Sequence, residues 1–218
     1  TTMFTSSLLT ATQKTYFQEI FSTGDTSSDA NANSELSIAY GHYNGSGSAD
    51  LTGNLNNDTP SRAIYKQYAQ LLLAPNDKKF TFDGVDLERI YVLNFTRASE
   101  RGKLDPGSSE LSMAQLSASF GDAFANNAHT GSNVKVAGDD RYIQIIDDSS
   151  LTSNGGISEG GLVYNLVSGS IDEGTSIHNS SNPVHYGLLY PQHGVAILNG
   201  EQLNKTLANG GVNFGSVT

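Results

Sequence analysis

The stretch GLLYPQHGVAILNG, from Gly187 to Gly200, holds two apolar runs joined by a short polar connector. The runs are Leu188–Tyr190 and Val195–Leu198, and the connector between them is PQHG. Proline presets the φ angle that a turn needs, and glycine accepts a positive φ. The stretch therefore predicts a β-hairpin with His193 in its turn.

Further segments on both sides of this hairpin have the composition and alternation of strands. They are Glu35–Tyr43, Lys79–Phe82, Arg89–Arg97, Ser109–Leu116, Asn133–Ala137, Tyr142–Ile146 and Gly160–Val167. Turn residues separate them, and they do not alternate with helices of the length that a parallel sheet requires. An antiparallel, mostly β arrangement is expected.

One segment, TPSRAIYKQYAQLLLAP from Thr59 to Pro75, has clear helical periodicity. Thr59 can cap this helix, Pro60 suits its first turn and Pro75 ends it. Four apolar residues recur at the spacing of one buried face: Ile64, Tyr68, Leu71 and Leu72.

A second, short helix is expected in the first 22 residues, where Phe17, Ile20 and Phe21 are spaced for one face. The predicted fold class is mainly β (α+β), an antiparallel β-sandwich or barrel-like domain with one main amphipathic helix at residues 60–74. Residues 1–34 are expected to form a helical or extended segment and polar loop that serve as an assembly arm. Residues 35–218 are expected to form the β-rich structural domain.

Composition excludes several function classes. The chain has 218 residues, 22 acidic against 12 basic side chains and a net charge of −10, which disfavours a nucleic-acid partner. It has no cysteine, so thiolate chemistry and cysteine-bound zinc are excluded. No apolar stretch reaches the roughly 20 residues of a membrane helix, and TTMFTSSLLTATQK lacks the features of a signal peptide. We expect no membrane partner and no export route of its own.

Histidines and glycine-rich loops give no catalytic motif. The five histidines (His42, His129, His178, His185 and His193) lack the spacing of a metal pair. His185 and His193 flank the hairpin and could face each other across it, although polar edge positions are the commoner role. The GSGS loop at Gly45–Ser48 lacks the lysine of a phosphate-binding loop, and no nucleophile-elbow motif is present.

Two acidic pairs, Asp139-Asp140 and Asp147-Asp148, bracket the strand-like segment RYIQII. Two carboxylates at the right separation could serve a glycosidase, but the pairs more simply end a strand where it reaches water. We predict no catalytic, cofactor-binding or metal-binding residue, no cofactor and no enzymatic activity.

A basic run lies at Arg89, Arg97, Arg101 and Lys103. These side chains are either a solvated strand exit or a protein interface, because arginine forms bidentate contacts with carboxylates and is enriched at interfaces. The sequence leaves the two readings open.

Five segments in order along the chain resemble one family: SIAYGHYNGSGS (37–48), PSRAIYKQYAQLLL (60–73), RIYVLNFTRASERGKLDPGSSELSM (89–113), LVYNLVSGS (162–170) and YGLLYPQHGVAILNG (186–200). The combination is similar to virion structural proteins of contractile-tailed phages of the marine cyanophage type. The resemblance implies a multi-copy component of the tail, baseplate, collar or fibre, assembled in the host cytoplasm into the virion. Its partners would be copies of itself and other virion proteins.

Two other functions remain open. A receptor-binding or glycan-binding module of a phage tail could stack sugars of the host surface on tyrosines, with Tyr40, Tyr43, Tyr186 and Tyr190 as candidates. A particle-borne glycan hydrolase could use the paired aspartates or a histidine.

Overall fold

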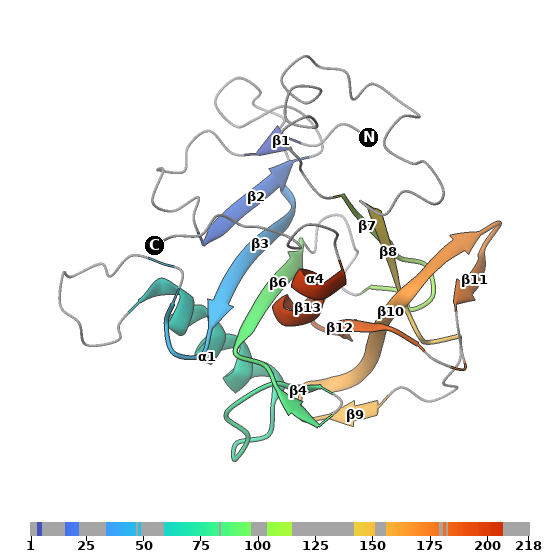
Figure 1. Cartoon of the computed structure of the whole chain (residues 1–218). Helices are drawn as coiled ribbons and strands as arrows, with labels where there is room; N and C mark the ends of the chain where they lie inside the picture. Colours follow the sequence, from blue (N-terminus) through green and yellow to red (C-terminus); the bar gives the residue numbers. More distant parts are fainter. Residues whose placement is uncertain are drawn as a thin grey trace.

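The computed structural model describes residues 4–5, 16–21, 34–46, 48, 59–82, 84–96, 104–114, 142–150, 156–178, 181 and 183–206. Its main feature is one large antiparallel sheet that curls into a half-barrel (Figure 1). The strand order across the sheet is β1 (Phe4–Thr5), β2 (Phe17–Phe21), β3 (Ser34–His42), β6 (Arg89–Phe95), β13 (Val195–Asn199), β12 (His185–Tyr190), β10 (Gly161–Asp172), β8 (Tyr142–Asp147) and β7 (Glu110–Ala114).

Four short strands complete the β structure. β9 (Gly156–Ser158) and β11 (Thr175–His178) pair with opposite ends of β10. β4 (Thr81–Phe82) and β5 (Val85–Asp86) form a separate two-stranded hairpin. With α1 (Pro60–Leu72) and α4 (Gly200–Thr206), the described chain is mainly β with one main helix. The predicted fold class is confirmed in its barrel-like form.

The predicted hairpin lies in the middle of the sheet. β12 and β13 pair antiparallel from Gly187 with Leu198 to Tyr190 with Val195, and Gly194 closes the turn with a φ of 65°. β6 pairs with the other edge of β13, and all five residues of β13 are buried. A strand covered on both faces needs no polar alternation, which explains the continuous apolar run of the sequence.

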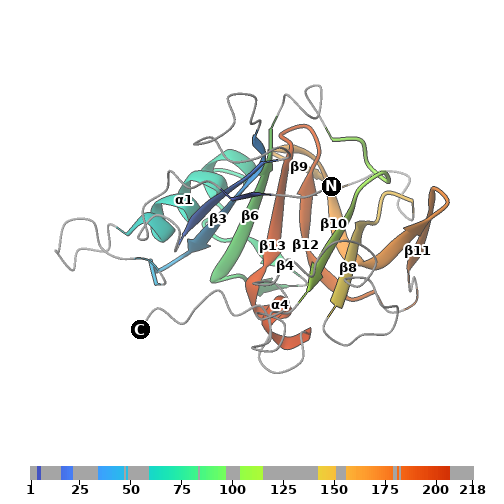
Figure 2. The same ribbon diagram turned by 90° about the horizontal axis from the view of Figure 1, so that it is seen from above.

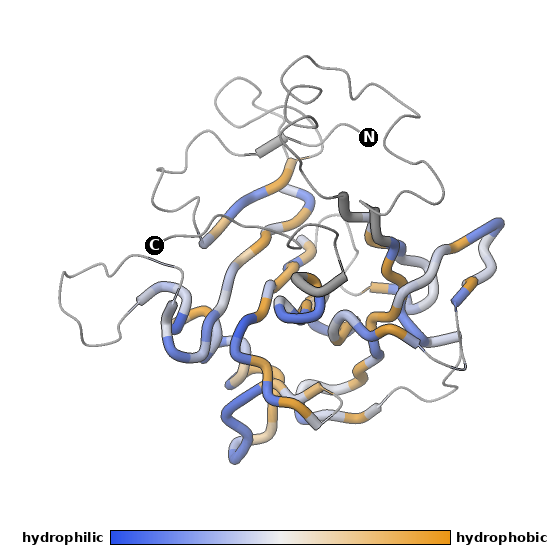
Figure 3. Tube along the Cα trace, in the orientation of Figure 1, coloured by the Kyte–Doolittle hydropathy of each residue, from blue (hydrophilic) through white to orange (hydrophobic). Residues whose placement is uncertain are grey.

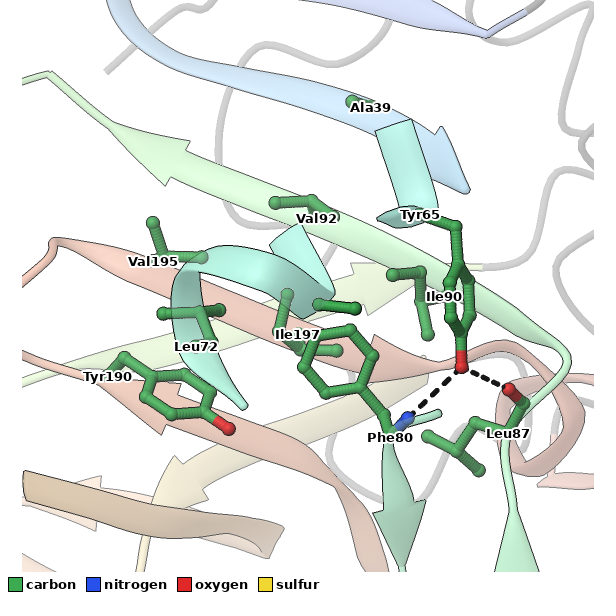
Figure 4. Close-up of a cluster of buried hydrophobic side chains, with 11 residues drawn as sticks. Ala39, Tyr65, Leu72, Phe80, Leu87, Ile90, Val92, Tyr190, Val195 and Ile197 are labelled. Atoms are coloured by element: carbon green, nitrogen blue, oxygen red, sulfur yellow. Dashed lines mark hydrogen bonds between the residues drawn. The ribbon is translucent and has the colours of Figure 1, made fainter. Parts of the chain in front are cut away.

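The helices cover opposite faces of the sheet (Figure 2). The face under α4 holds Leu203 of that helix, and Leu36, Ile38 and Tyr40 of β3 pack against the same cluster. The predicted alternation along β3 is therefore confirmed. The face under α1 holds a second cluster built around Ile90, Val92 and Ile197 of the central strands (Figure 4).

Helix α1 is present as predicted, but its buried face differs from the expected one. Tyr65, Ala69 and Leu72 are buried, whereas Leu71 is exposed and Ile64 and Tyr68 are half-buried. The Tyr65 hydroxyl donates a hydrogen bond to the Leu87 carbonyl oxygen at 2.6 Å and accepts one from the Phe80 N–H at 3.1 Å (Figure 4). The spacing of the apolar residues did not predict that Tyr65 is buried. Its side chain can be buried because the ring is apolar and the hydroxyl has two backbone partners.

Thr59 is the N-cap residue of α1 as predicted, but its side chain bonds to the preceding Gly/Ser loop instead of to the helix. Thr59 Oγ1 donates to the Gly45 carbonyl oxygen at 2.8 Å and makes no capping bond to the helix. Ser61 is fully buried, receives a hydrogen bond from Ser48 Oγ and donates one to the Ser46 carbonyl oxygen. The serines of this loop therefore have a structural role at the helix start.

The short helix predicted around Phe17, Ile20 and Phe21 is wrong, because these residues form β2. β2 pairs with β3 along its length, from Phe17 opposite Ala39 to Phe21 opposite Ser34. Cross-strand pairing with β3 overrides the weak helical spacing, as tertiary contacts commonly do for short segments. The polar stretch 22–33, which is part of the expected assembly arm, lies outside the described residues.

Candidate functional site

A cavity of about 370 Å³ lies between the β4–β5 hairpin, the start of β12 and the start of α4. We call it the hairpin pocket. Its ten lining residues come from three distant parts of the chain: Phe82, Val85, Asp86, Leu87, Pro183, Val184, His185, Asn199, Glu201 and Gln202. Its size lies near the lower end of the range of roughly 300–1,000 Å³ that small-molecule sites occupy.

Part of the lining of the hairpin pocket is apolar. Val85 and Val184 contribute side chains that remain 65% and 39% exposed. Phe82 is half-buried and meets the His185 ring edge-on, with the ring centroids 5.1 Å apart. This contact fixes the Phe82 ring in the pocket wall.

A β-bulge places His185 in this wall. The β10–β12 register changes from Leu166 opposite Gly187 to Val167 opposite His185, which leaves Tyr186 as the extra residue. A bulge reverses the side-chain alternation beyond it. Tyr186 therefore packs in the cluster under α4, while His185 lies against Phe82 on the other side.

The polar residues of the lining are held in place by internal contacts. Asn199 Oδ1 accepts hydrogen bonds from the backbone N–H groups of Glu201 and Gln202 and so caps α4. Glu201 Oε1 accepts a hydrogen bond from Arg89 Nε at 2.6 Å. Asp86 Oδ1 accepts one from Thr81 Oγ1 at 3.1 Å. These hydrogen bonds hold the two carboxylates in fixed orientations.

The charges around the hairpin pocket are largely paired. The hydrogen bond from Arg89 to Glu201 raises the pKa of the Arg89 guanidinium. Lys79 donates to Glu88 Oε1 at 3.0 Å, which raises the pKa of Lys79 and lowers that of Glu88. Burial raises the pKa of Tyr91, whose ring is tilted by 43° against that of Tyr40 with the centroids 5.4 Å apart. Neither Lys nor Arg is among the ten lining residues.

A second surface is formed by the hairpin of residues 169–178, which we call the β10–β11 arm. It projects from the edge of the sheet in both ribbon views (Figures 1 and 2). Glu173 and Gly174 form its two-residue turn with φ angles of 47° and 79°. The tip is hydrophilic (Figure 3), yet Ile177 on β11 is 53% exposed.

Glu110 secures the base of the arm. The pairing of β10 with β8 ends at Ser168 opposite Ile145, and the arm continues beyond it. Glu110 Oε2 accepts a hydrogen bond from the Ile171 N–H at 2.9 Å, and its Oε1 accepts one from Gln144 Nε2 at 2.7 Å. A single carboxylate therefore ties the arm to β8 where the strands separate.

The predicted basic interface is only partly visible. Arg89 lies at the start of β6, where it contacts Glu201 of its own chain. The sequence did not predict this intramolecular ion pair, because Arg89 and Glu201 are far apart along the chain. Arg97, Arg101 and Lys103 lie outside the described residues.

The expectation that Asp147 and Asp148 end a strand in water is wrong, because both are buried. Asp147 Oδ1 and Oδ2 each accept the Gly107 N–H at 2.9 Å. Asp148 Oδ1 and Oδ2 accept the backbone and side-chain N–H groups of Asn165 at 2.9 and 2.7 Å. The pair ties the Asp105–Gly107 turn and β10 to the end of β8. Asp139 and Asp140 lie outside the described residues.

The histidines and tyrosines considered in the sequence do not gather at one place. His193 is exposed in the hairpin turn, whereas His185 lies at the far end of β12, so the two do not face each other. Tyr186 and Tyr190 are both buried, and they belong to clusters on opposite faces of the sheet. The tyrosine platform considered for sugars is therefore not formed by these residues.

Within the described part of the chain, no three His, Asp or Glu side chains form a group that could hold a metal ion. Among the described helices, none has the length and apolar character needed to span a bilayer. Comparison of the chain with protein-family models, curated proteins and solved structures found no match.

Proposed function

We propose that this chain is a non-enzymatic structural component of a phage virion, present in many copies in the tail, baseplate, collar or fibre. The virion setting rests on the resemblance of the five sequence segments. The observation that best supports an assembly role is the apolar surface of β10 and its two edge strands. Of the six large apolar residues exposed in the described chain, three lie there: Ile157, Leu162 and Ile177.

The exposed residues of β9 and β10 form a cross-strand pair. Ile157 is 89% exposed and lies opposite Leu162 in the antiparallel register. Directly opposed side chains on one sheet are close neighbours, so the two make a small continuous apolar surface. The pair leaves apolar area exposed to water in a monomer, whereas an assembly partner that covers it buries that area.

Edge strands add backbone groups to this surface. β9 and β11 each pair with β10 alone among the described strands. An uncovered edge offers N–H and C=O groups to a strand of another chain. Apolar side chains beside open edges favour protein–protein contact, and symmetric oligomers are the usual result in a particle.

The buried aspartates fit a structural role. Asp147 and Asp148 both hold backbone N–H groups in place. Carboxylates used in this way stabilise the turn and strand that they join. This supports a scaffold over the alternative of a glycan hydrolase at this pair.

Immunogold labelling of purified particles, with mass-spectrometric counting of copies, tests the proposal. Label at one fixed station, with a copy number divisible by three or six, is the expected result. Finding the chain in infected cells but not in particles would contradict it.

The role of the apolar surface is tested separately by light scattering on the purified chain. Ile157→Lys is expected to shift the protein toward monomer, because a charge replaces apolar contact. Leu71→Lys is the matched control, since Leu71 is also exposed but belongs to α1 and not to β9, β10 or β11. An unchanged mass distribution for Ile157→Lys in an oligomeric wild type would exclude this surface as the contact.

A further inference from the structure

We propose that the hairpin pocket binds one ring of a neutral saccharide. This inference goes beyond the assembly role and does not depend on it, because it concerns a cavity within a single chain. It also uses none of the tyrosines that the sequence suggested.

The composition of the lining gives the first argument. Phe82, Pro183 and Val184 give the cavity apolar surface, and Asp86, Asn199 and Glu201 give it polar groups. A pyranose ring likewise has both kinds of surface, with C–H groups on its faces and hydroxyls at its rim. Aromatic and aliphatic side chains pack on such C–H faces, while convergent polar groups set the orientation.

The hydrogen-bonding groups give the second argument. Asn199 Oδ1 is used to cap α4, which leaves its Nδ2 amide as a donor. Glu201 uses Oε1 for Arg89, and a carboxylate accepts up to about four hydrogen bonds in total. Asp86 is likewise held by Thr81 through one oxygen. The cavity thus offers both fixed acceptors and a donor, which is what neighbouring hydroxyls require.

Charge decides between classes of ligand. Two carboxylates and no Lys or Arg line the cavity, so an anionic ligand would find no cationic partner in the lining. Glu201 is already neutralised by Arg89, and Asp86 lies 3.9 Å from Lys79. A cationic ligand would compete with these partners, whereas neutral hydroxyls can donate to the carboxylate oxygens without displacing them.

Chemical-shift mapping by ¹H–¹⁵N NMR of the full chain tests the proposal. The probes are the methyl glycosides of glucose, galactose, mannose and N-acetylglucosamine, with glucuronate and choline as the charged comparisons. At least one neutral glycoside is expected to give saturable shifts at Val85, Val184 and Gln202. Absence of saturable shifts with all four glycosides overturns the proposal, as does tighter binding of choline or glucuronate at these residues.

Variants separate pocket binding from general surface contact. Val184→Lys is expected to weaken the glycoside at least tenfold, because the longer side chain occupies the mouth of the cavity. Asp86→Asn is expected to weaken it several-fold by removing a charged acceptor. Leu71→Lys, which adds the same charge on α1, should leave the affinity unchanged. Equal affinity in Val184→Lys, with an unchanged spectrum elsewhere, would overturn the assignment to this pocket.

Discussion

Two hairpins in this molecule close with turns of different length and have opposite surroundings. The β12–β13 hairpin is paired on both outer edges and buried on both faces, and the β10–β11 arm projects at the edge of the sheet with Ile177 exposed. Both close with tight turns that use a glycine at positive φ. A tight turn with such a glycine therefore serves either hairpin. The residues of the strands decide whether the hairpin is buried in the core or exposed as a contact surface.

The largest expected difference in the free energy of unfolding is between variants of two isoleucines, Ile197 and Ile177. Ile197 in β13 is fully buried. Ile197→Ala should lower the free energy of unfolding by about 4 kcal/mol, because it removes buried apolar area and leaves a cavity. Urea unfolding at a concentration where the chain is monomeric measures this. A loss below about 1 kcal/mol would contradict the central position of β13.

The next effect concerns the core under α1. Tyr65→Phe keeps the ring but leaves the Leu87 carbonyl and the Phe80 N–H without their partner. The expected loss is about 3 kcal/mol, since unsatisfied buried backbone groups each cost about 1–3 kcal/mol. The same unfolding assay measures it. Tyr68→Phe is the matched control on the same helix and should change stability little, because Tyr68 is only half-buried.

Alkaline pH should weaken the buried core. Burial raises the pKa of Tyr65 and that of Tyr190 to about 12, above the ordinary value of 10. The folded state therefore holds these protons more tightly than the unfolded state. The free energy of unfolding keeps this contribution in full below pH 10 and loses it as the pH rises toward about 12. The loss is about 1 kcal/mol per buried tyrosine near pH 11. Unfolding and tyrosinate absorbance, followed together against pH, check this, and Tyr65→Phe should reduce the pH dependence.

An effect smaller than that of Tyr65→Phe is expected where β8 ends. Asp147→Asn replaces one of the two oxygens facing the Gly107 N–H with an amide donor. The expected loss is about 2 kcal/mol, within the range for hydrogen bonds to charged groups. Thermal or urea unfolding measures the loss, and Asp105→Asn on the exposed turn is the control. Equal stabilities of the two variants would show that burial of Asp147 contributes nothing.

The smallest effect completes the comparison. Ile177→Ala in the arm should change the free energy of unfolding by less than about 0.5 kcal/mol, because the side chain is already half in water. Urea unfolding of the monomer is again the measurement. A loss as large as that of Ile197→Ala would mean that the arm is part of the core.

Local sequence patterns predicted those elements whose own apolar residues indicate which faces are buried. The continuous run in β13 and the alternation in β3 led directly to their strands. β11 has the polar sequence TSIH, and β2 owes its conformation to β3, so neither carried a strong signal of its own. The sequence of α4 did carry a usable signal, because Asn199 before Glu201 and Gln202 is a helix-capping pattern.

The hairpin pocket was beyond prediction from sequence patterns. Its lining comes from residues 82–87, 183–185 and 199–202, which meet only because the sheet brings the start of β12 and the end of β13 beside the β4–β5 hairpin. The bulge at Tyr186 reverses the direction of His185, and strand alternation alone assigns that side chain to the wrong face. Such placement depends on pairing between strands rather than on any one segment.

The position of β13 has a consequence for synthesis on the ribosome. β13 is the last of the described strands in chain order, yet it lies in the middle of the sheet between β6 and β12. Until it emerges, the nascent chain can form only two unfinished half-sheets of the described strands, one ending at β6 and one ending at β12. Their apolar edges must wait for β13, so the sheet is completed late and these edges need protection from other nascent chains.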